Sequence, residues 1–380
     1  MKRNMYKWLA FFIIIPMITW AGNPKGKIDK SKTIKKEFSV SANALVRIDN
    51  KFGNLDVVTW SENRVVMEIT ITVNGNSESK VIDQLEKIDV QFSSSQTEVF
   101  AKTVIQKSSS GWWGSNNNSN FEINYKVKMP VTNSADFAND YGSISLNELK
   151  GKADINCDYG KIIIGSLHHE NNSINIDYTN NSTVEFINGG TINADYSGFT
   201  VDKAKKIDLN ADYTSSSFEH IENLTFNCDY GSIAVDNGNR ISGNGDYLTM
   251  KFGTIFKSLK VSADYGDIKV KELKAGFETV EIDADYTGVR LNVDPASAFK
   301  VIVKTSYGGF SYDDFMQFDK KIEKNNCAET QRSNDQAFER LHFLHVFCGN
   351  LVFSASLQHD GTWQKGLFEI FKRRAIDSGV

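Results

Sequence analysis

Residues 155–161 read INCDYGK, and residues 226–232 read FNCDYGS. Both stretches contain Asp-Tyr, and this pair recurs along the chain at intervals of 17 to 21 residues. The tyrosines of the series are Tyr141, Tyr159, Tyr178, Tyr196, Tyr213, Tyr230, Tyr247, Tyr265 and Tyr286, each preceded by Asp, and Tyr307, which follows Ser306. A fixed period near 18 residues predicts a solenoid, in which each repeat stacks on its neighbours.

The residues around each tyrosine keep a constant apolar pattern. Before Tyr159, apolar residues stand four and two positions back, at Ile155 and Cys157. Side chains of a strand alternate between its faces, so we expect these two residues and the tyrosine to share the inner face. After the tyrosine the pattern slips by one position, to Ile162 and Ile164, which predicts a corner at the Tyr-Gly or Tyr-Thr pair.

These features predict an all-β fold, a single-stranded parallel β-helix of about ten rungs. No 3.6-residue periodicity supports helical repeats, whereas a β-sandwich with recurrent hairpins remains an alternative. Cys157 and Cys228 occupy the same rung position four turns apart, and rungs about 4.8 Å apart put them ~19 Å from each other. A disulfide needs Cα atoms within about 7 Å, so we expect two small buried side chains that stay reduced.

The domain organisation follows from where the repeat begins and ends. The chain divides into a signal peptide (1–22), a lead-in rung and capping subdomain (23–134), the β-helix repeats (135–315) and an atypical tail (316–380). Phe52 takes the place of tyrosine in the lead-in rung. The small α+β capping insertion contains one short predicted helix, Glu78–Ile88, and its predicted strands are Val65–Val73, Ile88–Phe92, Glu98–Ile105 and Phe121–Met129.

The N-terminus predicts export. Three basic residues precede the apolar run Trp8–Trp20, and Ala21-Gly22 supplies small residues for cleavage. The run is shorter than the roughly 20 residues of a membrane-spanning helix, although an uncleaved anchor remains an alternative. We therefore expect the protein in the periplasm, on the outer-membrane surface or outside the cell, without a transmembrane segment in the mature chain.

The chain also resembles a known family over about residues 38–315. The features that carry the resemblance are the export signal, INYKVKMP at 123–130, DYGSISL at 140–146 and the serial Asp-Tyr repeats. Together they resemble the bacterial putative-adhesin family of β-strand-repeat envelope proteins. The resemblance implies a right-handed β-helix with a structural or adhesin-like role and no assigned biochemical activity.

Three side-chain ladders follow from the repeat, and we expect all three to be structural. The aspartates are Asp140, Asp158, Asp177, Asp195, Asp212, Asp229, Asp246, Asp264 and Asp285. A row of carboxylates could hold Ca²⁺, but the Gly-rich nonapeptide of Ca²⁺-binding rolls is missing, and we expect each Asp to accept the N–H two residues on. The asparagines three positions before the tyrosines should form stacked amide hydrogen bonds, and the tyrosines a stacked aromatic row. Glycan binding by either row remains an alternative.

Chemistry-bearing motifs are sparse. Trp112 and Trp113, within SSSGWWGSNNNSN (108–120), could contact a glycan or another partner, or could fold back onto the capping subdomain. The histidines show no zinc-ligand pattern, and no nucleophile elbow, P-loop or dinucleotide fingerprint occurs. A net charge of −4 without a basic face gives no reason to expect nucleic acid. We expect a non-enzymatic protein without metal or cofactor, whose partners are envelope glycans or another envelope protein. The alternative function is a glycan-binding or glycan-cleaving β-helix.

Two stretches depart from the pattern. Before Tyr247, Gly243 and Gly245 replace the usual apolar and small residues, so we expect the least packed rung and the fastest amide exchange near 241–247. Alanine at Gly245 should then stabilise the fold if the φ of this glycine is negative. In the tail, Phe338, Leu341, Leu344 and Phe347 have helical spacing, which is compatible with a capping helix, a membrane-surface segment or a shifted reading frame. Cys327 and Cys348 could pair in an oxidising compartment.

Overall fold

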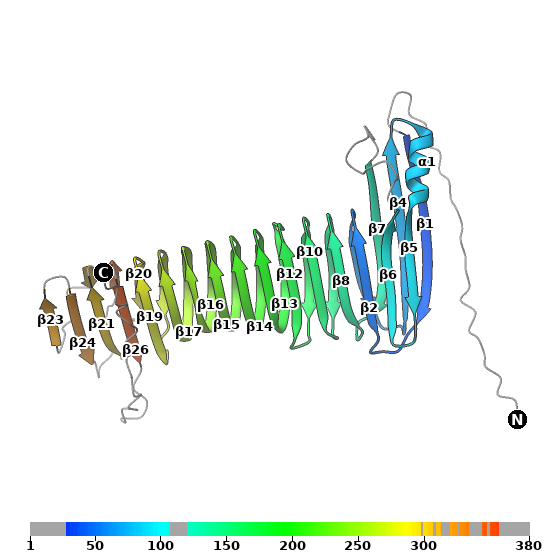
Figure 1. The fold of residues 1–380 in the computed structure, drawn as a ribbon. Helices are drawn as coiled ribbons and strands as arrows, with labels where there is room; N and C mark the ends of the chain where they lie inside the picture. Colours follow the sequence, from blue (N-terminus) through cyan, green and yellow to red (C-terminus); the bar gives the residue numbers. More distant parts are fainter. Residues whose placement is uncertain are drawn as a thin grey trace, which may run out of the picture.

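The computed structural model describes residues 28–106, 120–297, 299–306, 309–312, 320–324, 327–333, 344–347 and 350–356. Their strands stack into a rod, which carries an N-terminal cap at one end (Figure 1). The solenoid has about 9 turns with a period of about 18 residues, so the prediction of a parallel β-solenoid is confirmed. Wherever two strands within residues 134–293 pair with each other, they are parallel. This excludes the sandwich of recurrent hairpins.

Each turn contributes to two sheets. Strands of the first sheet end directly before the aromatic residue at each corner: β2 (Leu45–Lys51), β8 (Ser134–Asp140), β10 (Ala153–Asp158), β12 (Asn172–Asp177), the later parts of β13 to β17, and β19 (Thr279–Asp285). Strands of the second sheet follow the tyrosine: β3 (Leu55–Trp60), β9 (Ser143–Leu149), β11 (Lys161–Leu167), the earlier parts of β13 to β17, β18 (Asp267–Leu273) and β20 (Gly288–Val293).

The central turns run through both sheets as single long strands. These strands are β13 (Ser182–Asp195), β14 (Gly198–Asp212), β15 (Ser215–Asp229), β16 (Gly231–Asp246) and β17 (Leu248–Asp264). Equivalent positions align across the turns, because Cys157 pairs with Ile176, and the same row continues to Cys228 through Ala194 and Ala211. The predicted four-turn separation of the two cysteines is thus confirmed.

The core lies between the two sheets. In the turn around Tyr159, Ile155 and Cys157 from β10 and Ile162 and Ile164 from β11 are all buried. The same positions are filled by apolar residues along the rod, which gives one continuous core. No turn could bury these residues alone, so stacking is what stabilises the fold.

The tyrosines do not lie on the inner face, and that part of the prediction is wrong. Phe52 and the nine tyrosines from Tyr141 to Tyr286 have φ angles of 48° to 62°, in the left-handed region. Their side chains point outward, and the tyrosines are 46–65% exposed. Strand alternation holds only while the backbone stays extended. A left-handed residue breaks the alternation, so the phase slip occurs at the tyrosine itself.

The N-terminal cap extends both sheets beyond the first turn. It consists of β1 (Ile28–Ser39), β4 (Arg64–Gly75), α1 (Glu78–Lys87), β5 (Ile88–Ser94), β6 (Glu98–Ile105) and β7 (Asn120–Pro130). The first sheet continues from β2 to β6 and β5, and the second continues from β3 to β7, β4 and β1. The helix α1 packs against β4 and β1 (Figure 1). The predicted helix and strands of this region are therefore confirmed, although the helix ends at Lys87.

The two glycines before Tyr247 do not leave a packing defect. A Cβ at Gly243 would lie 2.5 Å from Cγ of Phe226, so the ring of the preceding turn already occupies this space. A Cβ at Gly245 would lie 2.2 Å from the carbonyl oxygen of Cys228, and the φ of Gly245 is outside the left-handed region. The expectation that alanine at Gly245 stabilises the fold is therefore wrong, and fast exchange near 241–247 loses its structural basis.

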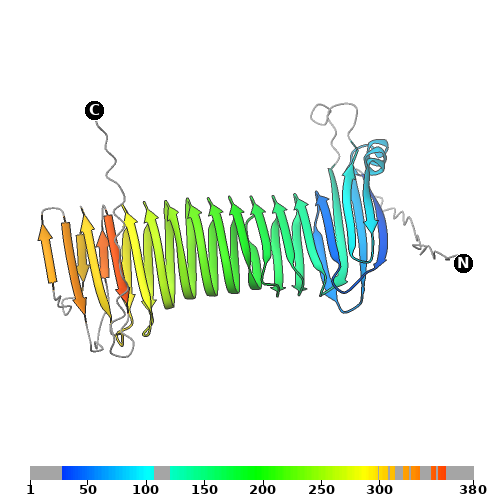
Figure 2. The ribbon, with the colours of Figure 1, turned by 60° about the horizontal axis from the view of Figure 1, so that its bottom comes forward.

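At the other end, strands of the tail interrupt the parallel order (Figure 2). The strand β26 (Asn350–Ser356) lies antiparallel between β19 and β21 (Lys300–Ser306). The strand β25 (Leu344–Phe347) lies antiparallel between β20 and β22 (Gly309–Tyr312). A hairpin of β23 (Lys320–Lys324) and β24 (Cys327–Ser333) follows beside β21.

Of the alternatives for the tail, the capping helix is wrong at Leu344 and Phe347, which belong to a strand. Phe338, Leu341, Tyr307 and Cys348 lie outside the described residues, as do the predicted signal peptide and residues 357–380. Within the described segments, no helix is long and apolar enough to cross a membrane.

Candidate functional site: the tyrosine edge

The outward tyrosines form one continuous row along the corner between the two sheets. We call this corner the tyrosine edge. It consists of Phe52, the nine tyrosines from Tyr141 to Tyr286 and the Asp before each tyrosine. Neighbouring rings from Tyr141 to Tyr286 have centroids 4.8–5.0 Å apart and planes within 7° of parallel. Phe52 continues the stack at 5.1 Å from Tyr141.

Backbone hydrogen bonds connect each corner of the tyrosine edge to the corner of the next turn. The N–H of each aromatic residue from Phe52 to Tyr265 donates to the carbonyl of the Asp one turn further on, at 2.8–3.1 Å. These bonds compensate for the left-handed conformation, which costs a residue other than glycine about 1–2 kcal/mol. The regular backbone thus places the rings at the spacing of the turns.

The stack determines which part of each ring a partner can reach. Both faces of every ring from Tyr141 to Tyr265 are covered by its neighbours, so ring edges and hydroxyls are what these residues present. Phe52 also contacts Phe121 in an edge-to-face arrangement, with ring centroids 5.1 Å apart. Sugar binding by aromatic side chains normally uses the ring face, and these faces are already occupied. The edge therefore offers polar contacts rather than a stacking platform.

Aspartates of the row accept hydrogen bonds from the next turn of the solenoid. The sequence instead predicts a local bond, from the N–H two residues after each Asp. The N–H of Asp212 donates to Oδ1 of Asp195 at 3.3 Å, and the same contact joins Asp229 to Asp212 and Asp246 to Asp229.

The N–H two residues after the Asp is used elsewhere in several corners. Thr179 N–H donates to Oγ of Ser197, and Ser197 N–H donates to Oγ1 of Thr214. The predicted local turn is therefore wrong for Asp177 and Asp195, and the hydroxyls of the next turn explain why.

Closely spaced carboxylates affect each other's protonation. Burial, followed by the charges of Asp177 and Asp140, raises the pKa of Asp158 above its usual value. At the far end, burial and Asp264 raise the pKa of Asp285. The charge of Asp140 itself is balanced by Lys51, whose Nζ lies 2.7 Å from the carboxylate. Among the described residues, no group of His, Cys, Asp and Glu has the arrangement of a metal site.

The asparagine ladder is present on the outer face of the first sheet, as predicted. Its members are Asn156, Asn175, Asn193, Asn210, Asn227 and Asn244. Asn175 donates to Asn156 at 2.8 Å, Asn193 to Asn175 at 2.7 Å and Asn210 to Asn193 at 3.0 Å. Asn244 likewise donates to Asn227.

Inside the corners, Cys157 and Cys228 are buried and free. Burial raises the pKa of each thiol to about 12. The Sγ of Cys157 donates to the carbonyl oxygen of Gly142 at 3.4 Å. Neither cysteine is therefore a nucleophile at neutral pH, because the reactive form is the thiolate.

A buried polar network joins the cap to the solenoid, and the sequence analysis missed it. Asn50 donates to Asn139 at 2.9 Å, and Asn139 donates to the carbonyl of Gly53 at 2.9 Å. Thr103 donates to Asn50 at 2.8 Å and is also bonded to the hydroxyl of Tyr125. The available signal was an asparagine two positions before Phe52 and Tyr141, where later turns carry small or apolar residues.

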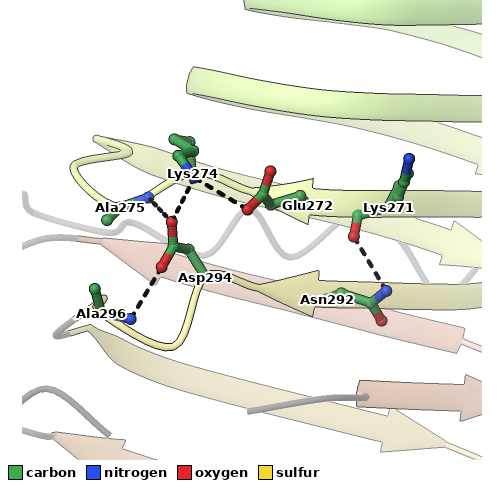
Figure 3. Close-up of polar contacts among 7 residues, drawn as sticks. All are labelled: Lys271, Glu272, Lys274, Ala275, Asn292, Asp294 and Ala296. Carbon is green, nitrogen blue, oxygen red and sulfur yellow. Dashed lines mark hydrogen bonds and ion pairs between the residues drawn. The ribbon is translucent and has the colours of Figure 1, made fainter. Parts of the chain in front are cut away.

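The opposite edge of the rod carries paired charges. Figure 3 shows Asp294 between Lys274 and the backbone N–H groups of Ala275 and Ala296. Lys274 lies 2.8 Å from Asp294 and 3.2 Å from Glu272, and it lowers the pKa of Asp294. These contacts join two neighbouring corners. The charged groups are already paired with each other, so a ligand would have to displace these contacts.

The histidines at 168 and 169 make local contacts within the described part of the chain. His168 lies 3.0 Å from Glu148 in an exposed corner, and the Nδ1 of His169 accepts the N–H of Asn171. Trp112 and Trp113 lie outside the described residues. The arrangement as a whole defines a β-solenoid whose most regular exposed feature is the tyrosine edge.

No family model matches the chain, and no curated protein matches it. Among solved structures, a putative adhesin from Parabacteroides distasonis is 13% identical, with a TM-score of 0.33, and the match covers 69% of this chain and 97% of that one.

Two further structures are similar at the same level. A putative cell adhesion protein from Clostridium sporogenes is 14% identical, with a TM-score of 0.23, over 59% of this chain and 100% of that one. A putative lipid binding protein from Parabacteroides distasonis is 9% identical, with a TM-score of 0.27, over 66% of this chain and 92% of that one.

Proposed function

We propose that this chain is an exported, non-enzymatic β-solenoid with a structural or adhesin-like role at the bacterial cell envelope. The observation that carries the proposal is the tyrosine edge, an exposed row of nearly identical groups that repeats at every turn along the rod. A repeating surface suits contact with a repeating partner, such as an envelope glycan or an assembly of another envelope protein. The basic and apolar N-terminus supports export.

Short connections support a role without catalysis. Between residues 134 and 306 the longest connections between consecutive strands are 274–278 and 294–299. Enzymes that act on polymers enclose their substrates in clefts with convergent polar groups, and such walls need longer loops. Along this part of the chain the surface is made of flat sheets and tight corners.

A glycan-binding or glycan-cleaving β-helix is the second candidate. The rows of asparagine and aspartate favour it, because planar polar side chains are suitable partners for sugar hydroxyls. The covered ring faces weigh against strong binding, since stacking would be lost. Release of reducing sugars from a polysaccharide panel separates the two candidates. Sustained turnover would replace the non-enzymatic proposal, and its absence from every polysaccharide is the expected result.

The adhesin-like role is tested by binding of the full chain to isolated cell-envelope fractions. Replacing Asp195 and Asp212 together by Asn removes two charges from the tyrosine edge. Replacing Glu219 and Glu222 by Gln makes the same change on the opposite edge, where both residues are exposed. We expect weaker binding for the first variant only. Equal binding by both variants and the wild type would show that this edge is not the contact surface.

Export is tested separately by cell fractionation. The full chain should be found outside the cytoplasm, and a chain lacking residues 1–22 should remain inside it. Retention of both forms in the cytoplasm would contradict the proposed location.

A further inference from the structure

We propose that the tyrosine edge is a modification site at which one-electron oxidation joins tyrosines of successive turns as dityrosine. The oxidant is hydrogen peroxide used by a haem peroxidase. The inference does not depend on the proposed envelope role, because it rests on the spacing and exposure of the phenols alone.

The geometry brings the reacting rings together before any oxidation occurs. Tyr196 and Tyr213 have centroids 4.8 Å apart and planes 1° from parallel, and their neighbours continue the same stack. Each of the two phenols is about half exposed, at 49% and 50%. An oxidant can therefore reach each ring, and the partner ring is already in contact.

The rings can also reorient without disturbing the core. Each tyrosine stands at an outer corner, whereas the buried residues of the same turn, such as Leu209 and Ala211 before Tyr213, point inward. Coupling requires the two rings to turn from a face-to-face stack so that their edges meet. Only the side-chain torsions of exposed residues need to change for this movement.

The chemistry balances with one peroxide for each link. The peroxidase removes one electron and one proton from each of two phenols, and this leaves two phenoxyl radicals. The radicals form a carbon–carbon bond between ring positions ortho to the hydroxyls. The hydrogen at each bonded position then returns to the phenoxyl oxygen as a proton. The two tyrosines have together lost two hydrogen atoms, and the peroxide has been reduced to two waters.

Links within one chain should dominate at low protein concentration. A neighbouring phenol held in contact reacts as if it were present at very high concentration, whereas a second molecule must diffuse to the site. The buried Tyr125 is not available, because its hydroxyl contacts Thr103 inside the cap junction. The expected products therefore join tyrosines 17 to 21 residues apart in sequence.

The consequence is a second covalent connection between turns, in addition to the backbone and to the packing, hydrogen bonds and ion pairs that already join them. In a stacked array each turn is stabilised by its nearest neighbours. A link between two turns prevents them from separating when the rod opens locally. We therefore expect the oxidised protein to unfold more slowly in denaturant than the untreated protein.

The test uses two variants with equal numbers of phenols. In the alternating variant, Tyr159, Tyr196, Tyr230 and Tyr265 are replaced by Phe, so no two remaining tyrosines of the described stack are neighbours. In the block variant, Tyr141, Tyr159, Tyr265 and Tyr286 are replaced by Phe, which leaves five consecutive tyrosines from Tyr178 to Tyr247. Phe52 shows that this position accepts phenylalanine, with φ of 62° and an intact stack on Tyr141.

Dilute protein is treated with peroxidase and hydrogen peroxide, and dityrosine is measured by its fluorescence and by mass spectrometry of peptides. The wild type and the block variant should yield links between neighbouring turns in monomeric protein, and the alternating variant should lose them. Circular dichroism before treatment confirms that all three proteins are folded. Equal yields from the two variants, links found only between separate molecules, or no dityrosine in the folded wild type would each overturn the proposal.

Discussion

The side chain of Leu248 fills the space beside Gly245. A Cβ on Gly245 would lie 2.8 Å from Cδ2 of Leu248, which is buried directly after the corner at Tyr247. Other turns carry Gly, Ser or Thr after the tyrosine and a larger residue two positions before it. In this turn the small residue, Gly245, stands two positions before the tyrosine, and the large residue, Leu248, stands directly after it. These two residues therefore pack the corner.

Replacing Gly245 by Ala should therefore destabilise the protein by about 1–3 kcal/mol, the usual cost of overpacking a filled core. Urea unfolding of both proteins gives the difference. Gly198→Ala is the matched control, because its Cβ would meet only a side-chain oxygen of Asn180 at 3.3 Å. We expect that control to be neutral or slightly stabilising. A Gly245→Ala protein as stable as the wild type would show that the backbone at Cys228 moves aside easily.

The stack itself should contribute measurable stability. Tyr196→Ala removes two ring contacts, with Tyr178 and Tyr213. At about 0.5–1.5 kcal/mol for each aromatic pair, we expect a loss of roughly 1–3 kcal/mol. Tyr196→Phe keeps both contacts and should stay within about 0.5 kcal/mol of the wild type. If alanine and phenylalanine have the same effect in urea unfolding, ring stacking does not stabilise the corner.

The buried thiols should make stability depend on alkaline pH. The folded pKa of about 12 lies above the ordinary value of 9.0 for Cys157 and Cys228. Above pH 9.0 the unfolded chain loses thiol protons that the folded chain keeps, so unfolding becomes easier as pH rises toward 12. The slope is up to about 1.4 kcal/mol per pH unit for each thiol.

The double replacement of both cysteines by Ala should remove this part of the pH dependence, because alanine occupies the same row at Ala194 and Ala211. At neutral pH, thiol reagents should label the two cysteines only after unfolding. A 157–228 disulfide in non-reducing peptide maps, or labelling of the folded protein, would contradict the stacked arrangement.

The pH dependence that Asp158 gives to stability should be opposite in direction to that of most carboxylates. Because the pKa of Asp158 is raised in the folded protein, the folded chain holds a proton that the unfolded chain releases above its value of 3.8. Stability from this group is present below that value and is lost as pH rises through the folded pKa. Asp158→Asn should therefore be more stable than the wild type at neutral pH, and the difference should shrink on acidification.

Asp236→Asn makes the same chemical change at an exposed position away from the row. Urea midpoints measured from neutral pH down to 3.8 compare the two variants with the wild type. A difference for Asp158→Asn that stays constant with pH would mean that burial and the neighbouring carboxylates do not raise the pKa of Asp158 in the folded protein.

The sequence was sufficient to predict the stacking of turns, the alignment of Cys157 with Cys228 and the asparagine ladder. These features depend on strand alternation and on a constant period, which are local properties that recur in every repeat. The helix Glu78–Lys87 could also be predicted from its own residues. Local patterns were sufficient because the same backbone geometry recurs at each turn.

Three features could not be predicted before the turns were stacked: the direction of the tyrosines, the partners of the aspartates and the packing around Gly245. Tyr159 points outward because its backbone is left-handed, and the N–H of this residue is bonded to the carbonyl of Asp177 in the next turn. The space at Gly243 is filled by Phe226 from the turn before. The tail strand β25 could not be predicted for the same reason, because its partners β20 and β22 come from distant parts of the chain. Each of these features depends on groups that approach each other only after the turns have stacked, so no single repeat contains the information.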